Sequence, residues 1–227
     1  MRYLKLHPWN VSYKEAVEIQ KRLKNQITLK SSFKNLNGKL IAGADVSYDK
    51  EIDRFYAGVV VFELQTMQKI EEVTASGKVG FPYIPGLLSF REAPILLRAF
   101  SKVKKTPDII MLDAQGIAHP RGIGLASHIG LLLNKPSIGC AKTRLIGEYN
   151  NVGKEVGYYS QLTIEGKVVG VVLRTRKNVK PVFVSPGHKI DLATSIDLVL
   201  KSCRGYKLPE PTRQAHNLVN KVRKGEI

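Results

Sequence analysis

Residues 108–142 alternate strand and helix patterns, and this alternation limits the fold more than any other feature of the chain. The run DIIMLD has a continuous apolar stretch that ends in a carboxylate, GLASHIGLLLN has a helical pattern, and PSIGCAK is a second buried strand. Strands of this composition are covered on both faces, and a helix between two of them is the connection that a parallel pair requires. The segment therefore predicts an α/β fold with a parallel strand pair.

The flanking segments predict further strands. Short β-rich runs separated by polar breaks such as DKEIDR and QTMQ are typical of an antiparallel meander. The runs cover residues 40–48, 57–64 and 69–77 before the central segment, and 157–163, 168–174 and 181–184 after it. The sheet is therefore expected to be mixed.

Four other segments have the apolar spacing of helices. They cover residues 13–25, 85–103, 188–203 and 209–225. Ser12 and Glu15 form a capping-box pattern at the start of the first. Pro94 interrupts the second, so a kinked or two-part helix is expected there.

Length and charge indicate one domain that meets a polyanion. The 227 residues, 43% of them hydrophobic, suffice for one sizeable core, and we expect a single catalytic domain over residues 1–227. The 36 Lys and Arg against 19 Asp and Glu give a net charge of +17. Such a field attracts nucleic acid, although the same surplus can simply keep a protein soluble.

Cysteine usage and the N-terminus bear on the compartment. Cys140 and Cys203 have no CxxC spacing, which argues against a disulfide framework or a zinc ribbon. The N-terminus lacks the apolar core of a signal peptide, and no run of roughly 18 apolar residues occurs. We expect a cytoplasmic protein without a membrane partner. A monomer is favoured because no apolar helix face is left unexplained.

Three carboxylates stand where burial is expected. Asp45 lies near the end of the first strand in LIAGADVSYD, Asp113 ends DIIMLD, and Glu92 lies among apolar residues in SFREAP. A buried carboxylate is unfavourable unless it is paired or binds a metal, and ligand sites lie at the carboxyl ends of parallel strands. Asp45 alone could equally cap a turn or pair with an Arg. Together the three suit a hard cation such as Mg²⁺.

Three basic residues are expected near the same edge of the sheet. His119 follows Asp113 by six positions, Arg121 lies beside it, and Lys142 ends the strand IGCAK. Taken singly, each is more often a surface or structural residue. At an edge that also holds acidic residues, they form the charge pattern expected where phosphate meets a metal.

The loop PYIPG contains two prolines that bracket an aromatic and a branched apolar residue. Pro82 and Pro85 stiffen it and hold Tyr83 and Ile84 outward. Rigid apolar wedges of this kind part stacked bases. An ordinary proline turn packed on the core would have the same residues.

These motifs together resemble the endonuclease V family. The similar segments are FPYIPGLLSFRE at 81–92, DAQGIAHPRGIGLASHIG at 113–130, IGCAKTRLIG, VFVSPGHKIDLATS and PEPTRQAH. They occur in the order of the family and cover nearly the whole chain.

The resemblance implies a fold and a set of site residues. The fold is ribonuclease H-like, with a mixed five-stranded central sheet flanked by helices. The metal is Mg²⁺, for which Mn²⁺ can substitute, and its ligands are Asp45, Glu92 and Asp113. Lys142 and His216 complete the catalytic set, and His119 and Arg121 lie near the phosphate. The wedge is Pro82, Tyr83, Ile84 and Pro85, and the base pocket is Leu88, Ala114, Gly116, Gly124 and Leu125.

The implied activity is DNA repair at deoxyinosine, the product of adenine deamination. The enzyme would hydrolyse the second phosphodiester bond 3′ to the lesion and leave 3′-hydroxyl and 5′-phosphate ends. Two alternatives stay open at this point: an inosine-specific endoribonuclease and a non-catalytic basic module that binds nucleic acid. One departure is visible, because Ala114 stands where the family pattern has Gly. A methyl group there is tolerated if φ is negative.

Overall fold

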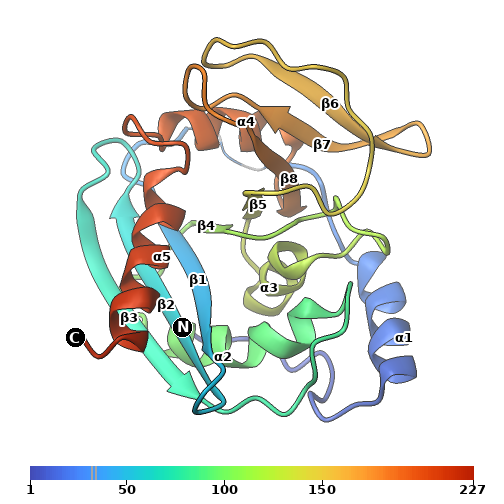
Figure 1. Cartoon of the computed structure of the whole chain (residues 1–227), viewed down its shortest axis with the longest axis vertical. Coiled ribbons are helices and arrows are strands. Elements are labelled where there is room, and N and C mark those ends of the chain that lie inside the picture. The colour runs from blue at the N-terminus through green and yellow to red at the C-terminus, as the bar shows by residue number, and fades with distance from the viewer. Residues whose placement is uncertain (32, 34) are drawn as a thin grey trace.

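The computed structural model describes residues 1–31, 33 and 35–227, and one mixed sheet runs through its centre (Figure 1). In this part of the chain the sheet has eight strands in the order β3-β2-β1-β4-β5-β8-β7-β6. The β1–β4 and β4–β5 pairs are parallel, and the other neighbours are antiparallel. The strands are β1 Leu40–Asp49, β2 Arg54–Glu63, β3 Lys69–Gly77, β4 Ile109–Leu112, β5 Ser137–Ala141, β6 Tyr159–Ile164, β7 Lys167–Leu173 and β8 Val182–His188.

The central prediction is confirmed, and the strand count that the resemblance implied is wrong. Parallel strands β4 and β5 flank a helix, as the alternation over residues 108–142 predicted. The sheet has eight strands among the described residues instead of five, because β8 pairs with the outer edge of β5 and β7 and β6 follow it. The three late β-rich runs thus extend the central sheet.

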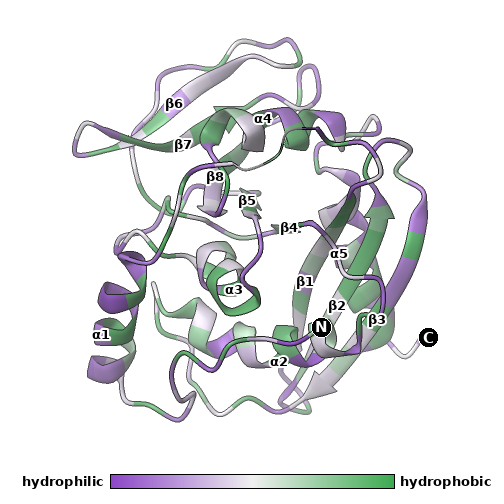
Figure 2. Ribbon diagram, turned by 180° about the vertical axis from the view of Figure 1, so that it is seen from behind, coloured by the Kyte–Doolittle hydropathy of each residue, from purple (hydrophilic) through white to green (hydrophobic). Residues whose placement is uncertain are grey.

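Helices cover both faces of the sheet. They are α1 Tyr13–Lys24, α2 Leu88–Lys102, α3 Leu125–Leu133, α4 Leu192–Lys201 and α5 Glu210–Arg223. In β1 the side chains alternate: Ala42 and Ala44 pack with α2 and α3, whereas Ile41 packs with α4 and α5. Every residue of α3 is buried, and Figure 2 shows this central helix as mostly hydrophobic.

One local prediction for the helices is confirmed and another is wrong. The Ser12–Glu15 capping box is present at the start of α1. Pro94 does not divide α2, which continues as one helix from Leu88 to Lys102, so the two-part alternative is wrong. Phe90 and Phe100, on either side of the proline, are both fully buried, and this packing offsets the hydrogen bond that proline cannot make. No helix in the described residues is long and apolar enough to cross a bilayer.

Gly43 in β1 lies directly beneath α5, so its substitution tests how closely this helix packs on the sheet. A Cβ atom at Gly43 would lie 1.9 Å from the main-chain oxygen of Pro211, whereas one at Gly80 would meet nothing within 4 Å. Gly43→Ala is therefore expected to lower the free energy of unfolding by at least about 3 kcal/mol, the upper range for overpacking. Gly80→Ala should change it by less than about 0.5 kcal/mol. Denaturant unfolding measures both, and equal effects would refute this packing argument.

Candidate active site

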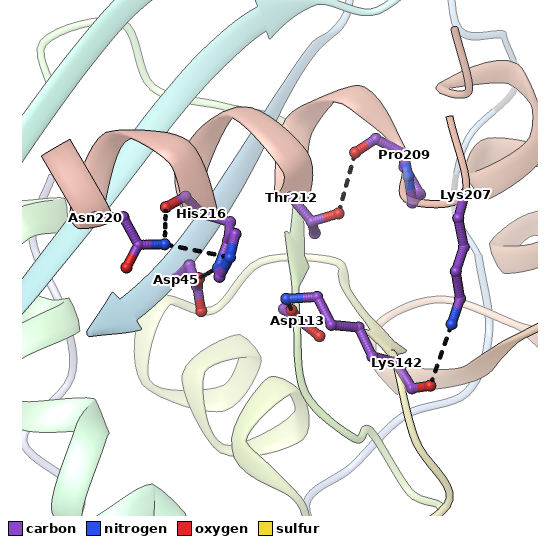
Figure 3. A network of polar contacts seen from close by, with 8 residues as sticks. All are labelled: Asp45, Asp113, Lys142, Lys207, Pro209, Thr212, His216 and Asn220. Carbon is purple, nitrogen blue, oxygen red and sulfur yellow. Dashed lines mark hydrogen bonds and ion pairs between the residues drawn. The ribbon is translucent and has the colours of Figure 1, made fainter. Parts of the chain in front are cut away.

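Asp45 and Asp113 lie side by side because their strands are parallel neighbours. Ala44 in β1 is in register with Leu112 in β4, and each aspartate is the next residue along its chain. Helix α5 crosses above them and brings His216 to the same place (Figure 3). One ligand atom from each of Asp45, Asp113 and His216 lies within 4.8 Å of the others. Two carboxylates and an imidazole therefore converge at the edge that the sequence indicated.

Hydrogen bonds hold the imidazole against the first carboxylate. His216 Nδ1 donates to Asp45 Oδ2 at 2.7 Å, and Asn220 Nδ2 contacts His216 Nε2 at 3.2 Å. Asn220 Nδ2 also donates to the main-chain oxygen of His216, at 2.9 Å, and Ser47 Oγ donates to Asn220 Oδ1, at 3.3 Å. Since Nε2 accepts from Asn220, the ring carries its proton on Nδ1, which orients both His216 and Asp45.

The second carboxylate is paired with a lysine. Lys142 follows the end of β5, and its Nζ lies 2.5 Å from Asp113 Oδ2. Burial raises the pKa of Asp113, while the hydrogen bond and positive charge of Lys142 act in the opposite direction. The pair places an ammonium group at the carboxylate cluster.

Glu92 lies beside this group on α2, outside the set of three close ligand atoms. Burial and the nearby charges of Asp45 and Asp113 raise the pKa of Glu92 to about 8. Carboxylates that repel one another in this way are stabilised by a divalent cation, for which carboxylate oxygens are suitable ligands. The residues present therefore fit a metal site.

A pocket of about 420 Å³ opens next to Asp113 and Lys142. Its lining includes most of the predicted wedge and base-pocket residues: Tyr83, Ile84, Pro85, Leu88, Ala114, Gly124 and Leu125. His119 also lines it, whereas Pro82 and Gly116 do not. Backbone φ at Ala114 is negative, so its methyl group is tolerated, as the departure from the family pattern required.

The main chain behind the pocket is already occupied by internal hydrogen bonds. Gly116 N donates to Ser185 Oγ, and Gly124 N donates to Gly116 O, both at 2.8 Å. A side chain at Gly116 would collide with the main chain of Pro186. Gly116 therefore supports the pocket from behind, and the N–H of Gly124 is not free to contact a ligand.

The PYIPG loop is held at its base by two of the predicted basic residues. Gly86 O accepts from His119 Nε2 at 3.0 Å and from Arg121 Nη2 at 2.5 Å, and Arg121 Nε donates to Gln20 Oε1. Burial and the charge of Arg121 lower the pKa of His119 to about 4, so its ring is neutral. Arg121 thus helps to hold the loop, and its position near the phosphate stays a prediction. Tyr83 projects from the loop with 66% of its surface exposed.

Sequence reasoning missed two polar residues of the site. Asn220 lies one helical turn after His216, and this spacing on an amphipathic helix was a usable signal. Gln115 lines the pocket and its Nε2 donates to the main-chain oxygen of Thr143 at 3.0 Å. No local pattern distinguishes Gln115 from an ordinary turn residue.

Comparisons with known proteins agree with this geometry. The family model for Endonuclease V matches residues 21–217. Endonuclease V of Kosmotoga olearia is 46% identical, over 98% of this chain and 97% of its own. The crystal structure of the Bacillus subtilis protein superposes with a TM-score of 0.94 at 31% identity, covering 100% of this chain and 98% of that one.

A third comparison involves a nucleic acid complex. Endonuclease V of Ciona intestinalis, solved with a 23mer DNA containing an inosine followed by a ribo-adenosine, has a TM-score of 0.84 and 27% identity. The match covers 96% of this chain and 100% of that one.

Proposed function

Because this chain belongs to the endonuclease V family, we propose that it is a metal-dependent DNA repair endonuclease that recognises deoxyinosine. The observation that carries the proposal is the convergence of Asp45, Asp113 and His216 beside a pocket that Asp113 also lines. A site that binds a base and a site that cleaves a phosphodiester thus share one residue. The proposed cut is the second phosphodiester bond 3′ to the lesion, with 3′-hydroxyl and 5′-phosphate ends.

The side chains have distinct proposed roles. Asp45, Asp113 and Glu92 would hold Mg²⁺, for which Mn²⁺ can substitute, and His216 would orient Asp45. The bound ion supplies water activation and charge neutralisation at the phosphate. The bond from His216 keeps Asp45 in one orientation, and the ammonium group of Lys142 offsets negative charge that develops on a phosphate oxygen.

We propose that Tyr83 acts as the wedge and the adjacent pocket receives the extruded base. The loop is stiffened by Pro82 and Pro85 and held by His119 and Arg121, so the exposed ring of Tyr83 keeps a defined direction. Extrusion of a base costs a few kcal/mol and least at a weak pair such as an inosine mismatch, which contributes to selectivity.

The same framework supports the finer structural proposals. We assign the fold to the ribonuclease H-like class, supported by carboxylates on β1 and after β4 in one mixed sheet. A single catalytic domain is supported by a site built from both halves of the chain, and we propose a monomer. Cys140 and Cys203 are free thiols, as expected in the reducing cytoplasm.

A second candidate is an inosine-specific endoribonuclease. The related Ciona protein was solved with a ribonucleotide directly after the inosine. A 2′-hydroxyl beside the lesion is what distinguishes RNA from DNA at such a position.

Cleavage of matched oligonucleotides tests the proposal. A labelled duplex with one deoxyinosine, an RNA strand with one inosine and an undamaged duplex are incubated with Mg²⁺, Mn²⁺ or EDTA. We expect nicking one nucleotide beyond the deoxyinosine with either ion and none with EDTA. Cutting confined to RNA would assign the second candidate, and binding without any cleavage would indicate a non-catalytic module.

A further inference from the structure

Lys207 lies beside the site, on the loop between α4 and α5. Its Nζ donates to the main-chain oxygen of Lys142 at 3.5 Å (Figure 3). The Nζ of Lys142, at the other end of that residue, contacts Asp113. Lys142 therefore contacts the ammonium group of Lys207 through its main chain and Asp113 through its side chain.

The main chain around Lys207 is held on both sides. Its carbonyl oxygen accepts from Thr175 Oγ1 at 2.5 Å. Two residues later, the carbonyl oxygen of Pro209 accepts from Thr212 Oγ1 at 3.1 Å. The ring centre of Tyr206, the residue before Lys207, lies 4.1 Å from the guanidinium carbon of Arg213. The ammonium group of Lys207 is therefore presented from a rigid support.

This ammonium group has no acidic partner of its own. Lys207 is half-buried, and among the described residues no carboxylate forms an ion pair with it. Burial lowers the pKa of Lys207, and the charges of Lys180 and Lys142 act in the same direction, against the nearby Asp113. A partly buried cation among other cations is unfavourable in the free protein, and an anionic ligand would offset this.

We propose that Lys207 binds a second phosphate of the substrate strand, adjacent to the phosphate held at Asp113 and Lys142. Successive phosphates of one strand are separated by a sugar and its bridging oxygens, a length comparable to a lysine side chain. Lysine binds phosphate as a point charge, and the single hydrogen bond from Lys207 to Lys142 leaves two of the three N–H donors of the ammonium group for a phosphate. This inference rests on the proposed endonuclease function.

A scan with uncharged phosphates tests the contact directly. Deoxyinosine duplexes carry a methylphosphonate at one linkage at a time on either side of the cut, and single-turnover cleavage is followed against enzyme concentration. For the wild type, one linkage other than the scissile one should raise the half-saturating concentration about tenfold, the value of a charge-assisted hydrogen bond. In Lys207→Ala that sensitivity should vanish at that linkage alone.

Matched variants separate this contact from a general charge effect. Lys167→Ala removes the same charge at an exposed position on β7 and should keep the sensitivity, as should Lys207→Arg. The slope of log affinity against log salt should fall by about one for Lys207→Ala. Unfolding midpoints equal to the wild type confirm intact variants.

Two results would overturn the inference. One is a Lys207→Ala enzyme with a normal half-saturating concentration and a reduced maximal rate, which would mean that Lys207 only positions Lys142. The other is sensitivity to every methylphosphonate unchanged from the wild type. A wild-type enzyme that cuts none of the duplexes would instead refute the proposed function. The measurements on the wild type alone would show this.

Discussion

Replacing Asp45 or Asp113 by Asn should reduce cleavage of a deoxyinosine duplex by at least about 10³-fold, equivalent to about 4 kcal/mol of transition-state stabilisation. Each substitution removes a charged ligand atom from the group formed with His216, while the shape of the side chain is kept. Binding should be retained or strengthened, because a carboxylate that repels phosphate is neutralised. Single-turnover rates and fluorescence anisotropy measure the two quantities.

Asp197→Asn is the matched control for this prediction. Asp197 is a half-exposed carboxylate on α4 that pairs with Lys201, away from the site. Its loss should leave cleavage within about twofold of the wild type, since surface pairs contribute little. If Asp45→Asn and Asp113→Asn cut as fast as Asp197→Asn, the carboxylates do not form the catalytic centre.

Tyr83→Ala should lower cleavage of duplex DNA about 10²-fold and have a much smaller effect on single strands. The exposed ring is the part of the PYIPG loop that can enter a base stack, and parting the stack costs a few kcal/mol that a single strand largely avoids. Single-turnover rates on the same deoxyinosine strand, alone and annealed, give the ratio of duplex to single-strand cleavage, which should fall in Tyr83→Ala.

Two variants show whether the aromatic wedge itself is responsible. Tyr83→Phe keeps the ring and should behave like the wild type. Tyr158→Ala removes another tyrosine, 58% exposed, which does not line the pocket, and should leave the ratio unchanged. Equal losses on duplex and single strand for Tyr83→Ala would mean that the residue contacts the base and does not part the stack.

Much of the central sheet was predictable because its signals are local. The continuous apolar runs of β4 and β5 identify buried strands whatever surrounds them, and the glycine turn after Asp113 marks a strand end. The extension of the sheet by β8, β7 and β6 was harder to predict from the sequence. Each late strand was visible as a β-rich run, but its neighbour in the sheet depends on which edge is free, and β8 pairs with β5 across a long connection.

Some residues of the site could also be predicted from local signals, and others could not. Asp113 could be proposed from its position directly after a buried strand and Asp45 from its place among small apolar residues, although Asp45 lies within β1 and not at its end. The bond from His216 to Asp45, in contrast, joins residues far apart in the chain. Arg121 illustrates the converse: its sequence position beside His119 suggested phosphate, yet its guanidinium binds Gly86 and Gln20. A long side chain can bind any of several partners, and the folded structure determines which of them lie within its reach.

The sequence by itself determined which residues are apolar, which segments form strands and helices, and that Asp113 follows a buried strand, because these depend on neighbours in the chain. Tertiary structure alone decided that α5 covers Asp45, that the N–H of Gly124 is used internally, and that Lys207 meets Lys142. Hydrogen bonds and ion pairs act over a few ångströms in space, and proximity of that kind between distant segments arises only when the layers pack.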